Sequence, residues 1–94
     1  MLRKDLQGKL ESDKVSADII RAGFLAYDYL NSMNKCPDGT AYSWEISDGV
    51  FGSPMTGWST SREKMQVALR IFEKHGVFKQ RETDFKYWIE EMLG

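Results

Sequence analysis

The sequence holds one cysteine and one histidine, and each scarcity excludes a class of protein. A single cysteine, Cys36, cannot build an internal disulfide framework, so we expect a reducing compartment and a cytoplasmic protein. His75 is the only histidine, so the usual Cys and His ligands of a structural zinc site are missing. We therefore predict no metal site and no cofactor.

Long apolar runs are also missing. No stretch approaches the roughly 18 consecutive apolar residues of a membrane-spanning helix. The N-terminal segment MLRKDLQGKLESDK lacks the apolar region of a signal peptide. We expect no membrane association. The 94 residues, of which 41% are hydrophobic and 13% aromatic, are typical of one ordered globular domain.

Catalytic patterns are equally scarce. His75 stands where a helix end is expected, which suits a partner of the helix dipole better than a catalyst. No Ser/His/Asp or Cys/His arrangement accompanies it. Cys36 lies next to Pro37 without a base nearby, and the loop GSPMTGWS lacks the lysine and the spacing of a phosphate-binding loop. We predict that the chain is not an enzyme.

The net charge of −1 and the pI of about 5.8 exclude a uniformly basic coat for nucleic acid. The charge is nevertheless uneven. Residues 59–81 carry six basic side chains against two acidic ones, a local balance of +4, whereas residues 82–94 have a balance of −3. The basic segment either contacts an anionic partner or is a solvated surface, and its charge alone leaves both alternatives open.

The segment 60–81 carries the signals of a complete helix followed by a short strand. Thr60 can cap its N-terminus, with Glu63 at the capping-box position. Gly76 is placed as the left-handed residue after the helix, so that the next residue folds back on Phe72 in a Schellman motif. The apolar positions i, i+3, i+4 and i+7 share one face and are Met65, Ala68, Leu69 and Phe72.

Other segments have their own patterns. Residues 16–34 predict a central scaffold helix with a wide apolar face, and the interior Gly23 marks a close helix crossing. Residues 77–81 predict a strand. Residues 85–93 form either a second wing strand or, as their apolar spacing favours, a helix. Residues 1–14 are either a polar arm or a short docking helix.

Residues 41–52 fit three alternatives. Alternating apolar residues suit a strand of a hairpin, whereas Ser43–Phe51 suits a short helix with Trp44, Val50 and Phe51 on its inner side. The third alternative is a short strand followed by one helical turn. The spacing of apolar residues places Trp44 and Trp88 in the core.

Residues 61–78, SREKMQVALRIFEKHGVF, match a known sequence pattern for a helix followed by the start of a strand. The pattern Ser-x-x-Thr-x-x-Ala-Leu-x-x-Leu-x-x-x-Gly followed by two hydrophobic residues is typical of small winged-helix domains in phage and plasmid replication or regulatory proteins. The chain resembles this family. The resemblance implies a mostly α fold with a small β element, a winged helix-turn-helix-like single domain over residues 15–94.

The resemblance implies a small DNA-binding protein, a regulator or replication accessory of a mobile element. Double-stranded DNA would be its partner. A homodimer through residues 16–34 or 85–93 would match paired half-sites. Outward positions of the helix and wing carry side chains that suit base edges and phosphates, namely Ser61, Arg62, Lys64, Gln66, Arg70, Lys79 and Arg81.

A protein-binding module of phage type, which inhibits a host enzyme or defence complex, is the alternative function. The small size and near-zero net charge favour it. Its partner would dock on the aromatic and thioether side chains of Phe51, Met55 and Trp58. Basic residues on a face free of Asp and Glu would favour DNA. Interleaved acidic residues, or an exposed apolar patch, would favour a protein partner.

Overall fold

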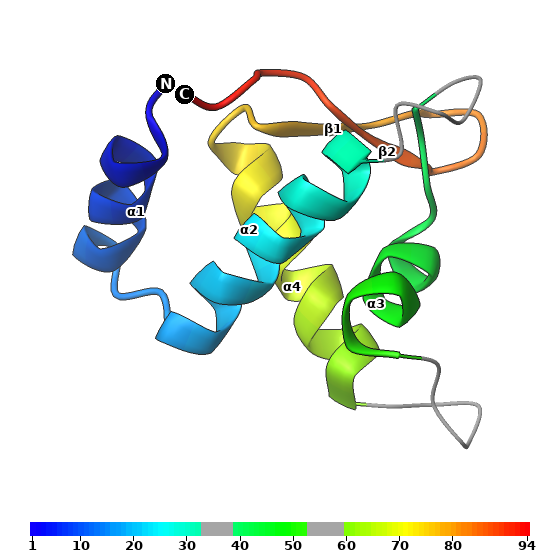
Figure 1. Cartoon of the computed structure of the whole chain (residues 1–94), viewed down its shortest axis with the longest axis horizontal. Helices are drawn as coiled ribbons and strands as arrows, with labels where there is room; N and C mark the ends of the chain where they lie inside the picture. Colours follow the sequence, from blue (N-terminus) through cyan, green and yellow to red (C-terminus); the bar gives the residue numbers. More distant parts are fainter. Residues whose placement is uncertain (33–38, 53–59) are drawn as a thin grey trace.

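The computed structural model describes residues 1–32, 39–52 and 60–94. These residues form a mostly helical fold with a small sheet, as predicted (Figure 1). The two strands pair antiparallel, and Ala41 forms a single bridge to Tyr87. The elements, in chain order, are α1 (Arg3–Ser12), α2 (Ala17–Ser32), α3 (Ser43–Phe51), α4 (Thr60–Lys74), β1 (Phe78–Gln80) and β2 (Tyr87–Ile89).

Helix α2 is the centre of the fold. It packs against α1, α3, α4 and β2, which explains why its apolar face is wide. Figure 1 shows α1 to one side of α2 and α3 to the other. The predicted close crossing at Gly23 is confirmed, because a Cβ there would lie 2.2 Å from the Phe72 ring of α4. The missing side chain therefore makes room for the ring.

Phe72 is the main aromatic contact point between α4 and the rest of the core. Its ring is fully buried and stacks on Phe78 with centroids 5.7 Å apart. It also meets the Phe24 ring edge-on at 5.3 Å. Such ring pairs add to the free energy gained from area burial. The ring thus joins α2, α4 and β1 at one place.

The C-terminus of α4 ends as predicted. Gly76 has a φ of +82°, in the left-handed region. The Val77 N–H donates to the Phe72 carbonyl at 3.1 Å, and the Gly76 N–H donates to the Glu73 carbonyl at 3.0 Å. These two bonds define a Schellman motif. Because Val77 is fully buried, β1 starts immediately against the helix that precedes it.

Residues 3–12 form a docking helix, one of the two alternatives for the N-terminus. Leu6 and Leu10 of α1 are fully buried and belong to the hydrophobic core that the described helices share. The Arg3 N–H donates to the Gly94 carbonyl at 3.2 Å, and the Gly94 N–H donates to the Met1 carbonyl at 3.0 Å. The two ends of the chain therefore lie side by side (Figure 1).

The helix favoured for residues 85–93 is wrong, because Tyr87–Ile89 is strand β2. Phe85 and Met92, two of the residues that matched a helical spacing, are 63% and 61% exposed. The strand pairs with β1 in the register Phe78↔Ile89, Lys79↔Trp88 and Gln80↔Tyr87. Backbone bonds to a partner strand decide this segment, and local periodicity does not report them.

Residues 43–51 form helix α3, and Ala41 provides the short strand position before it. The Glu45 carboxylate accepts the Tyr42 N–H at 3.0 Å, which helps to fix the start of the helix. The structure thus combines the helical alternative with the strand position of the mixed one.

The inner side of α3 agrees with the prediction only in part: Val50 packs against the core, but the two predicted aromatic residues do not. Ile46 and Ser47 are fully buried, whereas Trp44 is 50% and Phe51 42% exposed. Trp88 is only partly buried. The expectation that Trp44 lies in the core is therefore wrong, because the contacts of α3 with α2 and α4 select a different stripe of the helix.

Candidate nucleic-acid interface

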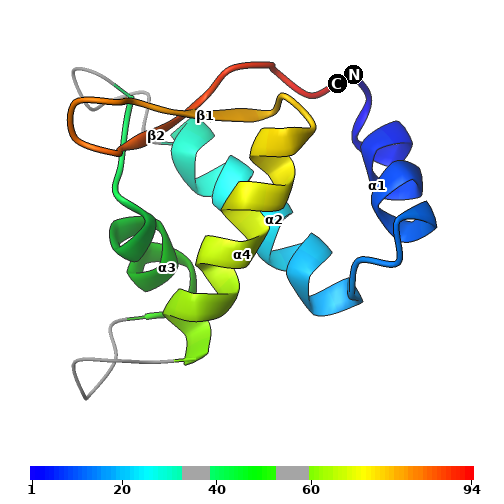
Figure 2. The same cartoon turned by 180° about the vertical axis from the view of Figure 1, so that it is seen from behind.

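Helix α4 has one buried face and one open face. The four predicted apolar residues are fully buried, whereas the opposite side exposes the acid Glu63 as well as Gln66, Val67, Arg70 and Lys74. Figure 2 shows α4 crossing the front of the molecule with no other described element over it. We call Gln66, Val67, Arg70 and Lys74, together with Lys79 of β1, the open face.

Strand β1 follows directly after the turn at the end of α4, and its Lys79 is exposed. Phe78 is buried and Lys79 is exposed, as expected for neighbouring residues of a strand. Among the described residues, Arg70, Lys74 and Lys79 form no ion pair. Their charges are directed to solvent.

Arg62 is held against α3. Its Nε and Nη2 donate to the two carboxylate oxygens of Asp48 at 3.1 and 2.7 Å. These hydrogen bonds, with the attraction between the charges, lower the pKa of Asp48 and raise that of Arg62. Planar guanidinium and carboxylate groups fit each other in this two-bond geometry. Arg62 therefore braces the first turn of α4 against α3.

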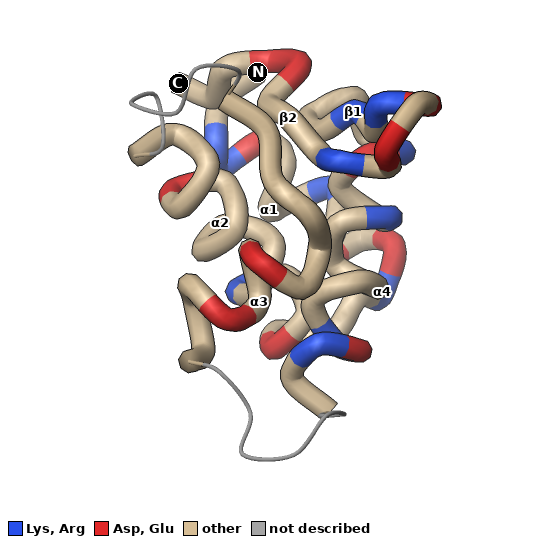
Figure 3. Tube along the Cα trace, turned by 90° about the vertical axis from the view of Figure 1, so that its right-hand side faces the viewer, with Lys and Arg blue, Asp and Glu red and all other residues tan. Residues whose placement is uncertain are grey.

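Two further basic residues also face carboxylates. The Nζ of Lys64 lies 3.7 Å from Asp18 of α2, and the Nε of Arg81 donates to Asp84 at 2.9 Å. Residues 59–81 have a net charge of +4. When the carboxylates of Asp18, Asp48 and Asp84 that face them are included, the net charge falls to +1. Figure 3 shows basic and acidic positions interleaved along α4 and the hairpin.

The ion pair at the hairpin turn gives a prediction on pH. Hydrogen bonds from Arg81 hold the pKa of Asp84 at about 2, below its ordinary value of 3.8. The ion pair therefore stabilises the fold fully above the ordinary pKa, and this stability is lost as pH falls through about 2. We expect Asp84→Asn to lower the melting temperature at neutral pH and to match the wild type in strong acid.

Thermal melts followed by circular dichroism across the acid range test this prediction. The matched control is Glu82→Gln, which removes an exposed acid of the same turn. A melting-temperature difference between Asp84→Asn and wild type that stays constant from neutral pH into strong acid would contradict the ion-pair account.

The structure divides the predicted DNA-binding residues into three groups. Gln66, Arg70 and Lys79 lie on the open face, whereas Ser61 is partly buried in the first turn of α4. Arg62, Lys64 and Arg81 face acids. Lys74 was missing from the prediction, although its spacing of four from Arg70 places it on the same side of a helix.

The residues predicted to bind a protein partner are only partly described. Phe51 is exposed at the end of α3, whereas Met55 and Trp58 lie outside the described residues. An exposed aromatic that the sequence did not indicate is Trp44. Its ring stacks on the Tyr42 ring, with centroids 6.0 Å and planes 10° apart.

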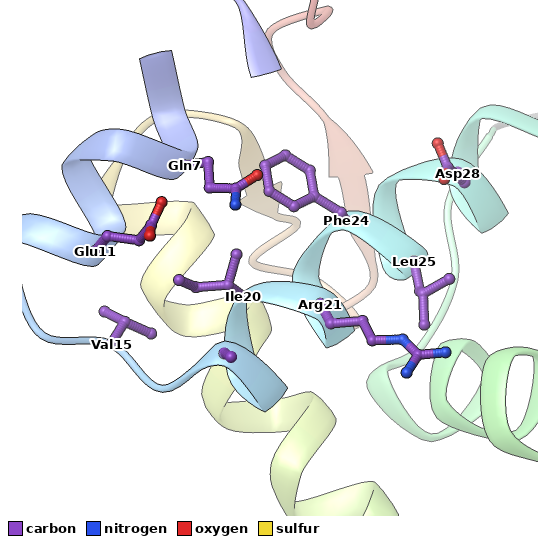
Figure 4. A pocket seen from close by; sticks show the side chains of 9 residues that line it. Gln7, Glu11, Val15, Ile20, Arg21, Phe24, Leu25 and Asp28 are labelled. Carbon is purple, nitrogen blue, oxygen red and sulfur yellow. The ribbon is translucent and has the colours of Figure 1, made fainter. Parts of the chain in front are cut away.

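A pocket of about 520 Å³ lies between α1 and α2 (Figure 4). Its walls include Val15, Ile20 and Phe24, and its edge carries Glu11 and Arg21. The charges at the edge have both signs, so the pocket selects no ligand by charge. No residue of α4 or of the hairpin lines it.

Within the three described stretches, no group of three His, Cys, Asp or Glu side chains could hold a metal ion. None of the described helices has both the length and the apolar character needed to cross a bilayer. Comparisons with protein-family models, with curated proteins and with solved structures find no significant match to this chain.

Proposed function

We propose that the chain is a small DNA-binding protein that places α4 in the major groove and the β1–β2 hairpin on the adjoining backbone. The order of elements carries this proposal: α2, the Ala41 bridge, α3, α4 and the hairpin follow one another. This is the order of the winged helix-turn-helix domains that residues 61–78 resemble. In that order, α4 takes the place of the recognition helix.

The open face of α4 suits a major groove in shape and chemistry. A helix with its side chains is about 10–12 Å across, and the groove is about 12 Å wide. Gln66 and Arg70 are exposed one turn apart near the middle of α4. Glutamine pairs well with adenine and arginine with guanine, while Lys74 and Lys79 suit phosphates.

The ion pairs support this arrangement as braces. The Arg62–Asp48 pair fixes the first turn of α4 to α3, and the Arg81–Asp84 pair fixes the turn of the hairpin. Glu63 is exposed at the N-terminal end of α4 and would repel phosphate there. We therefore infer that the contact centres on the later part of α4, from Gln66 to Lys74, and on Lys79.

Binding of a short random-sequence duplex across a salt series tests the proposal. We expect salt-sensitive binding by the wild type. The double variant Arg70→Ala/Lys79→Ala should bind at least about tenfold more weakly, and its salt slope should fall by about 0.9 for each phosphate that it no longer neutralises.

The matched control is Lys9→Ala/Arg21→Ala, which removes two exposed basic residues from α1 and α2. It changes the net charge equally and should bind like the wild type. Absence of binding at low salt, or equal weakening by both double variants, would contradict the proposal.

Docking on a protein partner is the second candidate function. Two observations favour it: the interleaved acids reduce the local charge to +1, and Phe51 is exposed. Roles in regulation or replication of a mobile element, and assembly as a homodimer, rest on the resemblance alone. Duplex binding that depends on Arg70 and Lys79 would decide between the two functions.

A further inference from the structure

The outer face of the small sheet carries three basic side chains and one aromatic ring, with a second aromatic ring beside it. Lys79 of β1 lies opposite Trp88 of β2. On the next row, the Arg81 N–H donates to the Lys86 carbonyl at 2.8 Å, and the Lys86 Nζ stands 5.0 Å from the centroid of the Tyr42 ring. The opposite side of the sheet faces the core. On the outer side, Lys79 is exposed, whereas Trp88 is partly buried and Arg81 is bound to Asp84.

The contacts between cations and aromatic rings continue from Tyr42 to the side chains of α3 and α4. The Tyr42 ring stacks on Trp44 with centroids 6.0 Å apart, and the guanidinium carbon of Arg62 lies 5.9 Å from the Trp44 centroid. Lys86, Tyr42, Trp44 and Arg62 thus form one chain of ring and cation contacts, which we call the aromatic–cation ladder. It connects the hairpin, the start of α3 and the start of α4.

Three acids near the ladder are bound, one of them by the ladder's own Arg62, whereas Glu63 beside Arg62 is exposed. The carboxylate of Asp48 is bound by Arg62, that of Asp84 by Arg81, and that of Glu45 by the backbone of Tyr42. Trp44 meanwhile keeps half of its surface in water. A large ring left exposed beside cations is the arrangement on which proteins stack the bases of single-stranded nucleic acid, with cations beside the phosphates.

We propose that the aromatic–cation ladder binds unpaired bases of single-stranded DNA, next to a duplex held by α4. The junction with a duplex rests on the proposed function. The stacking of bases on Trp44 does not. The ladder begins at Arg62, in the first turn of α4, and reaches Lys86 near the hairpin turn. A DNA strand that leaves the duplex near the first turn of α4 would meet the exposed Trp44 ring.

Fluorescence anisotropy with four probes tests the ladder: a blunt duplex, the same duplex with an oligothymidine tail, free oligothymidine and free oligouridine. We expect the tail to tighten binding by about tenfold, since every base has a face that stacks. Trp44→Ala should abolish this gain and leave the affinity for the blunt duplex unchanged. Trp44→Phe should keep most of the gain.

The matched control is Phe51→Ala, which removes the other exposed aromatic of α3 and should keep the full gain. Oligothymidine should also quench the tryptophan fluorescence of the wild type more than that of Trp44→Phe. Quenching reports contact with the ring, so a merely structural role of Trp44 would not produce it.

Four outcomes overturn the ladder, its ligand or the proposed function. A tail that adds no affinity, or equal effects of Trp44→Ala and Phe51→Ala, would remove the ladder as a base platform and favour protein docking on the exposed aromatics. Tighter binding of oligouridine would replace DNA by RNA as the ligand. Oligothymidine binding that needs Trp44, without any duplex binding, would support the ladder and overturn the proposed function.

Discussion

Replacing Gly23 by alanine is expected to destabilise the fold by about 2–3 kcal/mol. The added methyl group would lie 2.2 Å from Cε1, 2.3 Å from Cζ and 2.6 Å from Cδ1 of Phe72. The ring cannot swing away easily, because it is fully buried and packs against Phe78 and Phe24. The contact must therefore be relieved by moving α2 away from α4.

Thermal melting against the matched control Gly8→Ala measures this effect. Gly8 also lies inside a helix, but nothing stands within 4 Å of its added Cβ. Gly8→Ala should stabilise the protein by about 0.5–1 kcal/mol. Equal melting temperatures for the two variants would contradict the close crossing. Partial recovery on adding Phe72→Leu to Gly23→Ala would assign the clash to the ring.

Truncation of Phe72 to alanine is expected to cost about 3–5 kcal/mol. The ring is fully buried and makes the two aromatic contacts that join α2 and β1 to α4. Its loss would leave a cavity where three elements meet. The open face depends on this packing, because most of the residues of the open face belong to α4.

Urea unfolding of Phe72→Ala, Phe72→Leu and the control Phe85→Ala measures the contribution of the ring. Phe85 is 63% exposed, so its truncation should change the free energy of unfolding by less than about 0.5 kcal/mol. Phe72→Leu keeps most of the volume and remains measurable where the alanine variant unfolds. A loss below about 1.5 kcal/mol for Phe72→Ala would contradict the central place of this ring.

The sequence predicts best those features that local chemistry decides. The apolar spacing on α4 and the glycine after it act within a few residues, so the buried face and the Schellman motif both agree with the structure. Gly23 was also informative, since an interior glycine in a wide apolar helix indicates a close neighbour. Strand β2 was the alternative that the apolar spacing did not favour, because its partner strand, and not its own periodicity, determines it.

The candidate site was harder to predict, because charges on one segment meet acids from others. Arg62 pairs with Asp48, fourteen residues away in the sequence, and Lys64 meets Asp18 of α2. A local charge count includes the basic residues of a segment but leaves out these facing carboxylates. Local sequence patterns also leave out the contacts between helices. The exposure of Trp44 could therefore not be predicted, because it depends on which side of α3 packs against its neighbours.

Titration of the isotope-labelled protein with a short duplex, followed by backbone amide NMR shifts, tests the central claim most directly. The account predicts that the shifts cluster on α4 from Gln66 to Lys74 and on Lys79 of β1, with α1 and the α1–α2 pocket unchanged. Shifts confined to α1 and α2, or no shifts at low salt, would contradict the assignment of the open face as a DNA-binding surface.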